Sequence, residues 1–357
     1  MNTIGKIIGI IGYGGWGKAI ENIFHDLGYE VICADRELAP GLVSKEEVMQ
    51  KADVVIFCVD IWETVPLIKG LMPLAHSGQL LMDITSVKTW TMLEMSRHNI
   101  HAIGLHPQGQ PGNKGWKNLN VAVCCNACDE YLPWVLNVLE KSGAHPEVCT
   151  SWQHDKITSN FQCVIHAVLI AVVLLFKRVG IKKDSYAGFS TSLFRVFWCL
   201  AGRVLAKSAG LYSGIMMNNP YAVSALRLLE KNFRSLRVLV ERRDVEGFNV
   251  VFNEALGYYS SVGDVKEKSA LVTRYINLTD DASSKNSVCI TLAENRMGIF
   301  AEITHIFYVC GVDLSSISSD PIGDSFCFFA NFACDKEDER VQEALSQIAK
   351  IKGVSVN

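Results

Sequence analysis

The sequence predicts an α/β fold in which a doubly wound parallel sheet is followed by an all-α domain and a small α+β domain. Three changes along the chain lead to this prediction. Short apolar runs alternate with helical patterns over residues 1–150, helical patterns alone fill residues 151–278, and strand patterns return over residues 286–357. Continuous apolar runs between helices are typical of central parallel strands. A chain of 357 residues is long enough for two or three domains with their own cores.

The first predicted unit, Lys6–Leu27, consists of an apolar strand, a glycine turn and a helix with apolar residues at helical spacing. In such a turn Gly12 makes the tight bend, Gly14 lets a pyrophosphate approach the backbone, and Gly17 lets helix and strand pack closely. The helix N-terminus adds free N–H groups and the positive end of its dipole. We therefore predict a Rossmann-type dinucleotide site whose turn residues are Gly12, Gly14, Gly15, Trp16 and Gly17.

A second strand, Glu30–Ala34, ends at Asp35, about twenty residues after the glycines. A carboxylate at this position accepts hydrogen bonds from the adenosine ribose and opposes a 2′-phosphate, which favours NAD over NADP. Arg36 complicates this prediction, because a guanidinium beside Asp35 could bind that phosphate. The alternative interpretation of Asp35 is a solvated acidic residue at a strand end.

Two candidate catalytic residues follow strands of the predicted sheet: Ser86 after Gln79–Met82, and His106 after Ala102–Leu105. Because ligands bind at the carboxyl ends of parallel strands, we expect the hydroxyl and the imidazole on one rim. A histidine can transfer a proton near neutral pH, and a nearby hydroxyl can orient it. The alternatives are a loop histidine and a serine that caps the helix beginning at Val87.

The helical region carries charged residues inside apolar patterns. Arg195 and Arg203 lie eight residues apart, just over two helical turns, so they share roughly one face. Each needs an anion, which is either a substrate carboxylate or a protein carboxylate. The preceding helix contains the apolar run Cys163–Phe176, whose fourteen residues are too few to span a bilayer. We expect this run to be buried on all sides, in a domain core or a dimer interface.

Composition limits the kinds of partner. With 34 basic and 37 acidic residues the formal net charge is −3, so the chain carries no charge signal for nucleic acid or an anionic membrane. The expected partners are small molecules and further copies of the chain. The 12 cysteines are scattered mostly within apolar patterns, as reduced and buried thiols are, and no metal site is predicted. No signal-peptide pattern is evident, which favours a cytoplasmic protein.

The last part of the chain has a mixed pattern. Residues 279–286 are small or charged and are predicted to form a linker. The elements expected after them are a strand, a helix, two strands and a helix, with a last strand around Val354. This β-α-β-β-α-β order indicates a small ferredoxin-like module.

In order and spacing, the motifs of the chain resemble those of the bacterial prephenate dehydrogenase family over about residues 5–263. These motifs are the glycine turn, Ser86-Val87-Lys88, His106-Pro107, His154-Asp155 with His166, and Ala201-Gly202-Arg203. The C-terminal module resembles the amino-acid-sensing ACT domain. The resemblance implies that prephenate loses a hydride to NAD⁺ and its ring carboxylate as CO₂, which yields 4-hydroxyphenylpyruvate in tyrosine biosynthesis.

The resemblance also implies a role for each candidate residue. His106 would accept the hydroxyl proton as a general base, and Ser86 would orient the imidazole or the substrate hydroxyl. Arg203 would bind a substrate carboxylate. The supporting groups of the substrate pocket would be Arg195, His154 and His166. A homodimer through the helical domain and feedback inhibition by tyrosine at the ACT-like module are further implications. A module that only pairs copies of the chain is the alternative.

Three other functions remain open. Arogenate carries an amino group where prephenate has a keto group, and the absence of Asp and Glu between His106 and Cys128 favours the keto substrate. β-Hydroxyacid dehydrogenases share the domain order but generally rely on a lysine of the helical domain, where Lys156 is the only one before Lys177. A non-catalytic nucleotide or amino-acid sensor would bind NAD without turnover.

Overall fold

The computed structural model describes residues 6–37, 39–97, 100–111, 115–127, 129–181, 189, 191–269, 272, 286–293, 296–322 and 325–356. Packing divides the chain into two units. Unit 1 consists of Met1–Leu175 and Arg203–Arg243, and unit 2 consists of Phe176–Gly202 and Asp244–Asn357. The division at residues 150 and 278 that the sequence indicates differs from these units and stays a prediction. The predicted linker, residues 279–286, lies outside the described residues except for Asn286.

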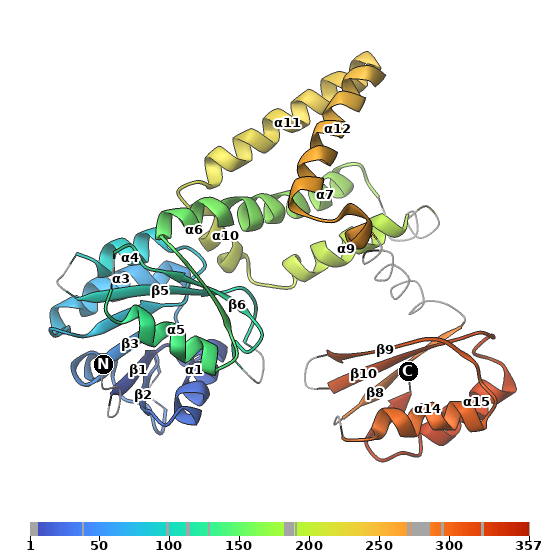
Figure 1. Ribbon diagram of the computed structural model, residues 1–357, viewed down its shortest axis with the longest axis horizontal. Coiled ribbons are helices and arrows are strands. Elements are labelled where there is room, and N and C mark those ends of the chain that lie inside the picture. The colour runs from blue at the N-terminus through green and yellow to red at the C-terminus, as the bar shows by residue number, and fades with distance from the viewer. Residues whose placement is uncertain are drawn as a thin grey trace. The chain divides into compact units, whose positions relative to one another are not determined.

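Unit 1 is built on a seven-stranded sheet with the strand order β2-β1-β3-β4-β5-β6-β7 (Figure 1). The strands are β1 (Ile7–Ile11), β2 (Glu30–Ala34), β3 (Val54–Phe57), β4 (Leu80–Asp83), β5 (His101–Pro107), β6 (Asn120–Cys124) and β7 (His145–Cys149). The first five strands pair in parallel, as predicted. Their carboxyl ends therefore meet at one edge of the sheet, where the glycine turn, Asp35 and Ser86 follow strands. His106 does not follow its strand as predicted but lies within it, because β5 extends to Pro107.

The prediction of a wholly parallel sheet is wrong at β6, which pairs antiparallel with β5. β7 then pairs in parallel with β6. The described residues between β5 and β6 form no helix that crosses over the sheet, and a strand joined without such a crossover returns antiparallel. This reversal sets His106 opposite Ala122 and leads the chain through β7 into the helix that carries His154.

Helices cover both faces of this sheet because successive side chains of a strand point to opposite faces. On one face Ile8, Val54 and Leu80 pack in a core with α1 (Gly15–Asp26) and α5 (Leu132–Lys141). On the other face Val55 and Leu81 belong to a second core. The helices of that second core are α2 (Lys45–Lys51), α3 (Ile61–Leu71) and α4 (Thr89–Met95), and a short 3₁₀ turn (Met72–Leu74) follows α3.

A continuous helical run follows β7 and belongs to unit 1 as far as Leu175. It consists of α6 (Ser151–Thr158), a π-helical segment (Ser159–Val164) and α7 (Ile165–Arg178). Through α6 and the π-helical segment the run packs against α4, α10 and α11. The later helices are α9 (Ser192–Leu205), which belongs to unit 2 as far as Gly202, and α10 (Ala209–Asn218) and α11 (Ala222–Arg242) of unit 1. The sequence predicts helical segments at residues 193–209 and 222–241, which correspond to α9 and α11, but none at α10.

The prediction that Cys163–Phe176 is buried in a domain core is wrong for most of the run, whereas its burial in a dimer interface stays a prediction. Cys163 is buried, but among the described residues of α7 only Leu169 is, whereas Ile165 and Leu174 are exposed. The whole run Ser151–Arg178 has 28 residues and is long and apolar enough to cross a membrane by length and composition. Its first half nevertheless packs against the helix that follows β4, as a helix of a folded unit does.

Unit 2 contains α12 (Val245–Val262) and a four-stranded antiparallel sheet with two helices (Figure 1). The strands are β8 (Ser287–Leu292), β9 (Leu314–Ile322), β10 (Ser325–Phe332) and β11 (Val354–Val356), in the order β11-β8-β10-β9. The helices are α14 (Ile299–Val309) and α15 (Glu339–Ile348). Ile303, Phe307, Phe328 and Ala344 share one core. The element order is the predicted one, including the last strand.

Candidate active site

The glycine turn between β1 and α1 has the geometry of a phosphate-binding turn. Gly12 adopts a φ of +103°, and a Cβ there would lie 2.5 Å from the carbonyl oxygen of Cys58. A Cβ on Gly17 would lie 2.0 Å from the carbonyl oxygen of Gly12. Gly14 differs, because a Cβ there would meet no protein atom within 4 Å. Gly12 and Gly17 are therefore required by the fold, whereas the open space above Gly14 suits a pyrophosphate.

A cavity of about 1210 Å³ extends from this turn along the end of β2. Gly12, Gly14, Asp35 and Arg36 line it, so the residues present fit a dinucleotide. The Asp35 carboxylate accepts hydrogen bonds from the backbone N–H groups of Tyr13 and Arg36, each at 2.6 Å. The other predicted members of the turn take different places: Gly15 opens α1, and Trp16 is half-buried against the core beneath the turn.

His106 is the second residue from the end of β5 and belongs to a chain of hydrogen bonds. Its Nδ1 atom lies 2.9 Å from Nε2 of His154, and Nδ1 of His154 lies 2.7 Å from Oδ1 of Asp155. The Asp155 carboxylate also accepts the backbone N–H groups of Lys88 and Thr89, at 2.9 and 2.7 Å. The N-terminus of α4 thus fixes the carboxylate, the carboxylate fixes the imidazole of His154, and His154 contacts that of His106.

This chain assigns the protons of the two rings. The carboxylate accepts from Nδ1 of His154, so Nε2 of a neutral His154 has a lone pair that accepts from Nδ1 of His106. Nε2 of Gln108 also lies 3.1 Å from this Nδ1, so this arrangement requires the Gln108 amide to present its oxygen to His106 instead. Nε2 of His106 is then unprotonated. Burial, followed by the neighbouring His154 and Lys88, holds the pKa of His106 well below its usual value, so the ring is neutral at physiological pH. Burial raises the pKa of Asp155, but hydrogen bonds from His154 and from two backbone N–H groups outweigh it and the pKa is lowered.

A fully buried ion pair lies behind His106. The Lys88 ammonium donates to Oδ2 of Asp83 at 2.5 Å and to the carbonyl oxygen of Leu105 at 2.7 Å. Both side chains are inaccessible to solvent. The carbonyl group of Leu105 immediately precedes His106, so this pair fixes the end of β5 while its ammonium disfavours a proton on the imidazole.

The π-helical segment brings a glutamine to the open nitrogen of His106. Nε2 of Gln162 lies 3.4 Å from Nε2 of His106, which is long for a hydrogen bond and leaves the lone pair accessible. Oε1 of Gln162 and Nδ1 of His166 are buried atoms without a hydrogen-bond partner among the described residues. Such atoms mark a place where a polar ligand would satisfy them, and π-helical turns occur frequently at functional sites.

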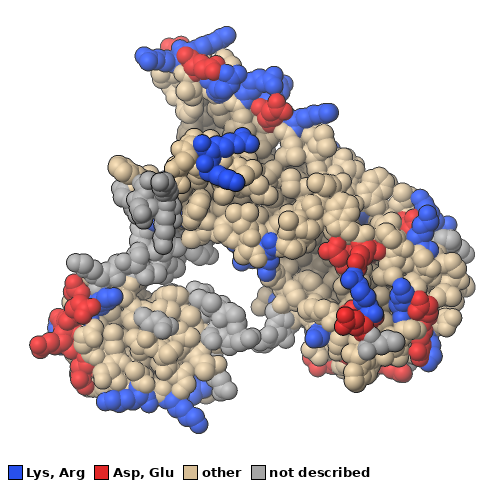
Figure 2. All heavy atoms as spheres, turned by 180° about the vertical axis from the view of Figure 1, so that it is seen from behind, with Lys and Arg blue, Asp and Glu red and all other residues tan. Residues whose placement is uncertain are grey.

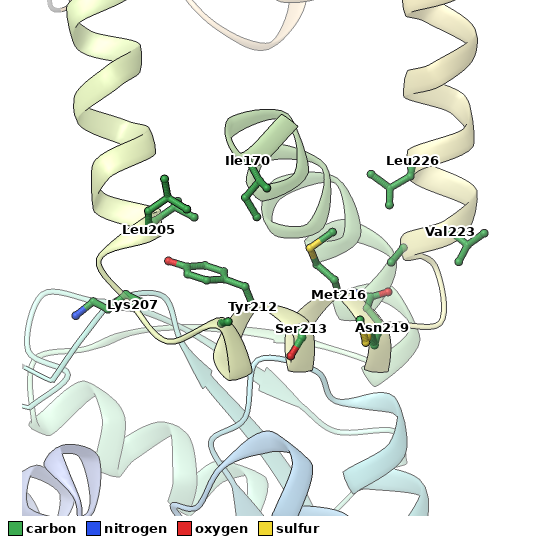
Figure 3. Close-up of a pocket in the computed structure, with 13 residues that line it drawn as sticks. Ile170, Leu205, Lys207, Tyr212, Ser213, Met216, Asn219, Val223 and Leu226 are labelled. Atoms are coloured by element: carbon green, nitrogen blue, oxygen red, sulfur yellow. The ribbon is translucent and has the colours of Figure 1, made fainter. Parts of the chain in front are cut away.

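A second cavity, of about 780 Å³, opens beside His166. Its wall is mostly apolar, and Figure 3 shows Tyr212 and Met216 rising from α10 between Leu205 on one side and Leu226 of α11 on the other. The Tyr212 ring meets the His166 ring edge-on at 4.6 Å. Lys207 lines the same cavity and donates to Oε1 of Gln110 at 3.0 Å. The cavity offers an aromatic wall and a cation within reach of the loop after β5.

Comparison with known families decides the assignment. Residues 33–145 match the family described as prephenate dehydrogenase, nucleotide-binding domain, and residues 150–254 match the one described as prephenate dehydrogenase, dimerization domain. The two matches together cover more than half of the chain. The chain belongs to the prephenate dehydrogenase family. It is therefore related to oxidoreductases, and the resemblance inferred from its motifs is confirmed for this part of the chain.

Individual members of the family are distant in sequence. A Methanocaldococcus jannaschii protein whose name includes arogenate/prephenate dehydrogenase is 27% identical over 73% of this chain. The chain spans 63% of the length of that relative. The T-protein of Haemophilus influenzae is 26% identical over 75% of this chain and 70% of its own length. The crystal structure of Aquifex aeolicus prephenate dehydrogenase with hydroxyphenyl propionate and NAD⁺ shares the fold, with a TM-score of 0.61 at 16% identity, over 74% of this chain and 100% of that chain.

The family assignment does not by itself place the candidate residues, but the geometry places several. His106, His154 and His166 lie within one set of contacts with Gln162 and Tyr212. Ser86 lies in the loop after β4, and within the described part of the chain it forms no hydrogen bond with His106. It does not cap α4 either, because Lys88 precedes that helix. The role of Ser86 therefore stays a prediction.

The two arginines occupy α9, as predicted, but in different units. Arg203 is exposed in the last turn, beside Val204 and Leu205 of the apolar cavity. Burial raises the pKa of Tyr212, and the nearby Arg203 guanidinium opposes that shift, which puts the guanidinium charge close to the cavity. Arg195 belongs to unit 2, and its role in substrate binding stays a prediction.

The sequence analysis includes Lys88 and Asp155 in its motifs but gives no role to them or to Gln162. The signal for Lys88 was its position in an apolar neighbourhood next to the start of a helix, and the signal for Asp155 was its direct proximity to His154. Nothing in a single sequence indicated that Gln162 would face His106, because the π-helical turn changes which residues share a face. Within the described residues, no group of three His, Cys, Asp or Glu side chains could hold a metal ion.

Proposed function

We propose that the chain catalyses the oxidative decarboxylation of prephenate to 4-hydroxyphenylpyruvate, with NAD⁺ as the oxidant. The observation that carries the proposal is the hydrogen-bonded series Asp155, His154 and His106, which leaves Nε2 of a neutral, buried imidazole ready to accept a proton. A general base positioned in this way accelerates a reaction by about 10²- to 10⁴-fold.

The cofactor and the two histidines have separate roles in the proposed reaction. When bound, NAD⁺ supplies the acceptor for the hydride that leaves the hydroxyl-bearing ring carbon. Nε2 of His106 takes the hydroxyl proton as the carbonyl forms, the ring carboxylate departs as CO₂, and the electron pair released makes the ring aromatic. His106 then returns the proton to the phenolate oxygen. His154 holds the imidazole of His106 in one tautomer and stabilises the positive charge that His106 gains with the proton. It therefore acts through His106, in addition to any contact that it makes with the substrate.

Substrate binding uses the groups that surround the open nitrogen of His106. Oε1 of Gln162 and Nδ1 of His166 lack partners among the described residues, and Arg203 is the candidate for a substrate carboxylate. Arginine suits this task because its guanidinium binds a carboxylate through two parallel hydrogen bonds. Arg195 and Ser86 complete the proposed set.

The substrate preference follows from the carboxylates near the site. Arogenate would require an acidic partner for its amino group. Asp155 is engaged by His154 and two backbone N–H groups, and Asp83 is engaged by Lys88. Oδ1 of Asp83 has no hydrogen-bond partner among the described residues, but both carboxylates are fully buried and neither is exposed to an amine, which supports the keto substrate prephenate.

Absorbance at the NADH band tests the proposal, with prephenate or arogenate and with NAD⁺ or NADP⁺ in all four combinations. The expected result is a rise with prephenate and NAD⁺ that is lost in His106→Asn and retained in His145→Asn, an exposed histidine at the start of β7. Binding of NAD⁺ without a rise in any mixture would contradict the enzyme proposal and favour a sensor. A faster rise with arogenate would contradict the substrate.

The proposal extends to assembly, location and control. A homodimer formed by the helical region is supported by the match to a dimerization domain and by the exposed apolar side chains of α7 and α11. We place the protein in the cytoplasm. We assign residues 286–357 as an ACT-like module that mediates feedback by tyrosine, supported by its β-α-β-β-α-β order. Deleting residues 284–357 should abolish inhibition by tyrosine while dehydrogenase activity remains. Unchanged inhibition would instead indicate competition at the substrate pocket.

A further inference from the structure

The ribose end of the cofactor cavity contains an ion pair that the reaction does not use. Nη2 of Arg36, directly after Asp35, lies 2.5 Å from Oε1 of Glu63 on the first turn of α3. Both residues line the cavity that begins at the glycine turn. We propose that Glu63 determines cofactor specificity, because it occupies the Arg36 guanidinium that would otherwise bind the 2′-phosphate of NADP. This inference rests on the dinucleotide site of the proposed function.

The geometry explains why Arg36 alone does not predict NADP binding. In dinucleotide sites, a carboxylate at the end of the second strand favours the free ribose 2′-hydroxyl, and an arginine nearby accommodates a 2′-phosphate. This chain has both side chains in sequence. The carboxylate of Glu63 decides between them, since it satisfies the guanidinium on the protein side and adds a second negative charge next to that of Asp35.

The charges around the cavity act in the same direction. Its lining holds two basic residues, Arg36 and Lys45. Its acidic lining residues are Asp35, Glu37, Glu46, Asp60 and Glu63. Figure 2 shows basic and acidic side chains interspersed over the sheet-bearing part of unit 1, at the lower right of that view. A 2′-phosphate adds up to two negative charges to a cavity with an excess of carboxylates. Among these carboxylates, Glu63 is the one that pairs with Arg36, the cation directly after Asp35 in sequence.

The pair is suited to specificity rather than to stability. Its side chains are 76% and 52% exposed, and exposed ion pairs contribute little to folding. A substitution of Glu63 therefore leaves the fold intact and changes the local charge. Once the Glu63 charge is removed, the Arg36 guanidinium is free to donate charge-assisted hydrogen bonds to the 2′-phosphate, so NADP⁺ binding is expected to strengthen by about tenfold.

Isothermal titration of NAD⁺ and NADP⁺ into the purified full chain tests the inference without any turnover. In Glu63→Gln, NADP⁺ is expected to bind about tenfold more tightly than to the original chain, with NAD⁺ affinity nearly unchanged. Adding Arg36→Ala to Glu63→Gln should remove the gain. The matched control is Glu47→Gln, because Glu47 forms a similar exposed pair with Lys51 at 2.6 Å and does not line the cavity. It should alter neither affinity.

Two outcomes would overturn the inference. Equal changes of NAD⁺ and NADP⁺ affinity in Glu63→Gln would show a general charge effect. A gain that persists when Arg36 is also replaced would show that another cation binds the phosphate. Either result would leave the proposed reaction intact. Failure of both nucleotides to bind the original chain would instead reject the dinucleotide site and, with it, the proposed function.

Discussion

The Nδ1 atom of His106 and the Nε2 atom of His154 lie 2.9 Å apart, although the two residues come from a strand and a helix separated by 48 positions. When Nδ1 of His106 donates to His154, Nε2 is the nitrogen of His106 that is left for chemistry. The contact also makes the base dependent on Asp155, whose carboxylate is held by the backbone of the α4 N-terminus.

The first prediction concerns His154. His154→Phe removes the acceptor for Nδ1 of His106, so the imidazole loses its tautomer and orientation, and kcat should fall by about 10²-fold or more. His154→Gln supplies an amide oxygen at a similar place and should retain more activity than the phenylalanine variant. Steady-state kinetics with prephenate measure both. Equal losses in the two variants would mean that His154 does not act through the hydrogen bond.

The second prediction concerns the pH profile. His106 must be neutral to accept a proton, and burial, His154 and Lys88 lower its pKa. The rate constant kcat/KM should therefore stay level as the pH falls from 7.5 to about 6.5, the ordinary pKa of a histidine. It should decline only at lower pH. A profile of kcat/KM against pH in buffers of constant ionic strength measures this. An acidic limb centred above pH 6.5 would contradict the assignment of His106 as a neutral, buried base.

The third prediction concerns acid stability. Above pH 6.5 His106 is neutral in both the folded and the unfolded chain, so it contributes no pH dependence. As the pH falls below 6.5, the unfolded chain binds a proton that folded His106 refuses, and the free energy of unfolding decreases, by about 1 kcal/mol per pH unit, until the folded pKa is reached. Urea unfolding at pH 7.5 and 5.5 measures this loss. It should be smaller in His106→Asn; an identical loss would exclude His106 as its source.

The fourth prediction concerns the buried ion pair of Lys88 and Asp83. Lys88→Met leaves an unpaired carboxylate inside the protein, and such a change costs about 3–5 kcal/mol. In the double variant with Asp83→Asn the remaining group is uncharged, so the loss of stability should be smaller than the sum of the two single losses. Urea unfolding of the three variants gives the coupling energy. Additive losses would show that the two charges do not stabilise each other.

The fifth prediction separates two glycines of the same turn. Gly17→Ala places a Cβ 2.0 Å from a carbonyl oxygen and should destabilise unit 1. Gly14→Ala meets no protein atom within 4 Å, so its unfolding curve should match the original while NAD⁺ affinity falls. Thermal unfolding and calorimetric titration together measure this. Unchanged NAD⁺ affinity in Gly14→Ala would mean that the pyrophosphate does not pass over this residue.

The fold was predictable where the signal is local. The runs that form β1 and β3, the glycine turn and the helical spacing of α11 each encode their own structure, and the module after residue 286 follows from its element order. The direction of β6 was not predictable in this way, because the sequence of a short apolar strand does not indicate the direction in which the strand pairs. The direction depends on the connection, and the described residues between β5 and β6 form no crossover helix.

The site was predictable only by residue type. His106 and His154 stand out as polar groups after a strand and near a helix start, but their contact depends on pairing that no spacing reveals. Gln162 was concealed for a different reason. Its face is set by a π-helical turn, which arises from packing and leaves no distinct pattern in a single sequence. The exposure of α7 likewise could not be read from its apolar composition, which fits a buried helix equally well.

The π-helical segment also has a genetic consequence. A π-helical turn is wider than an α-helical turn, since its backbone bonds join residues five apart rather than four. Loss of one codon among residues 159–164 would let Ser151–Arg178 continue as a regular α-helix. The wide turn would lose its extra residue, so the residues after the deletion would keep the face that they have now, and only the side chains of the turn itself would change direction. A single in-frame codon deletion in this turn would thus disturb the contact of Gln162 with His106 without turning the rest of α7.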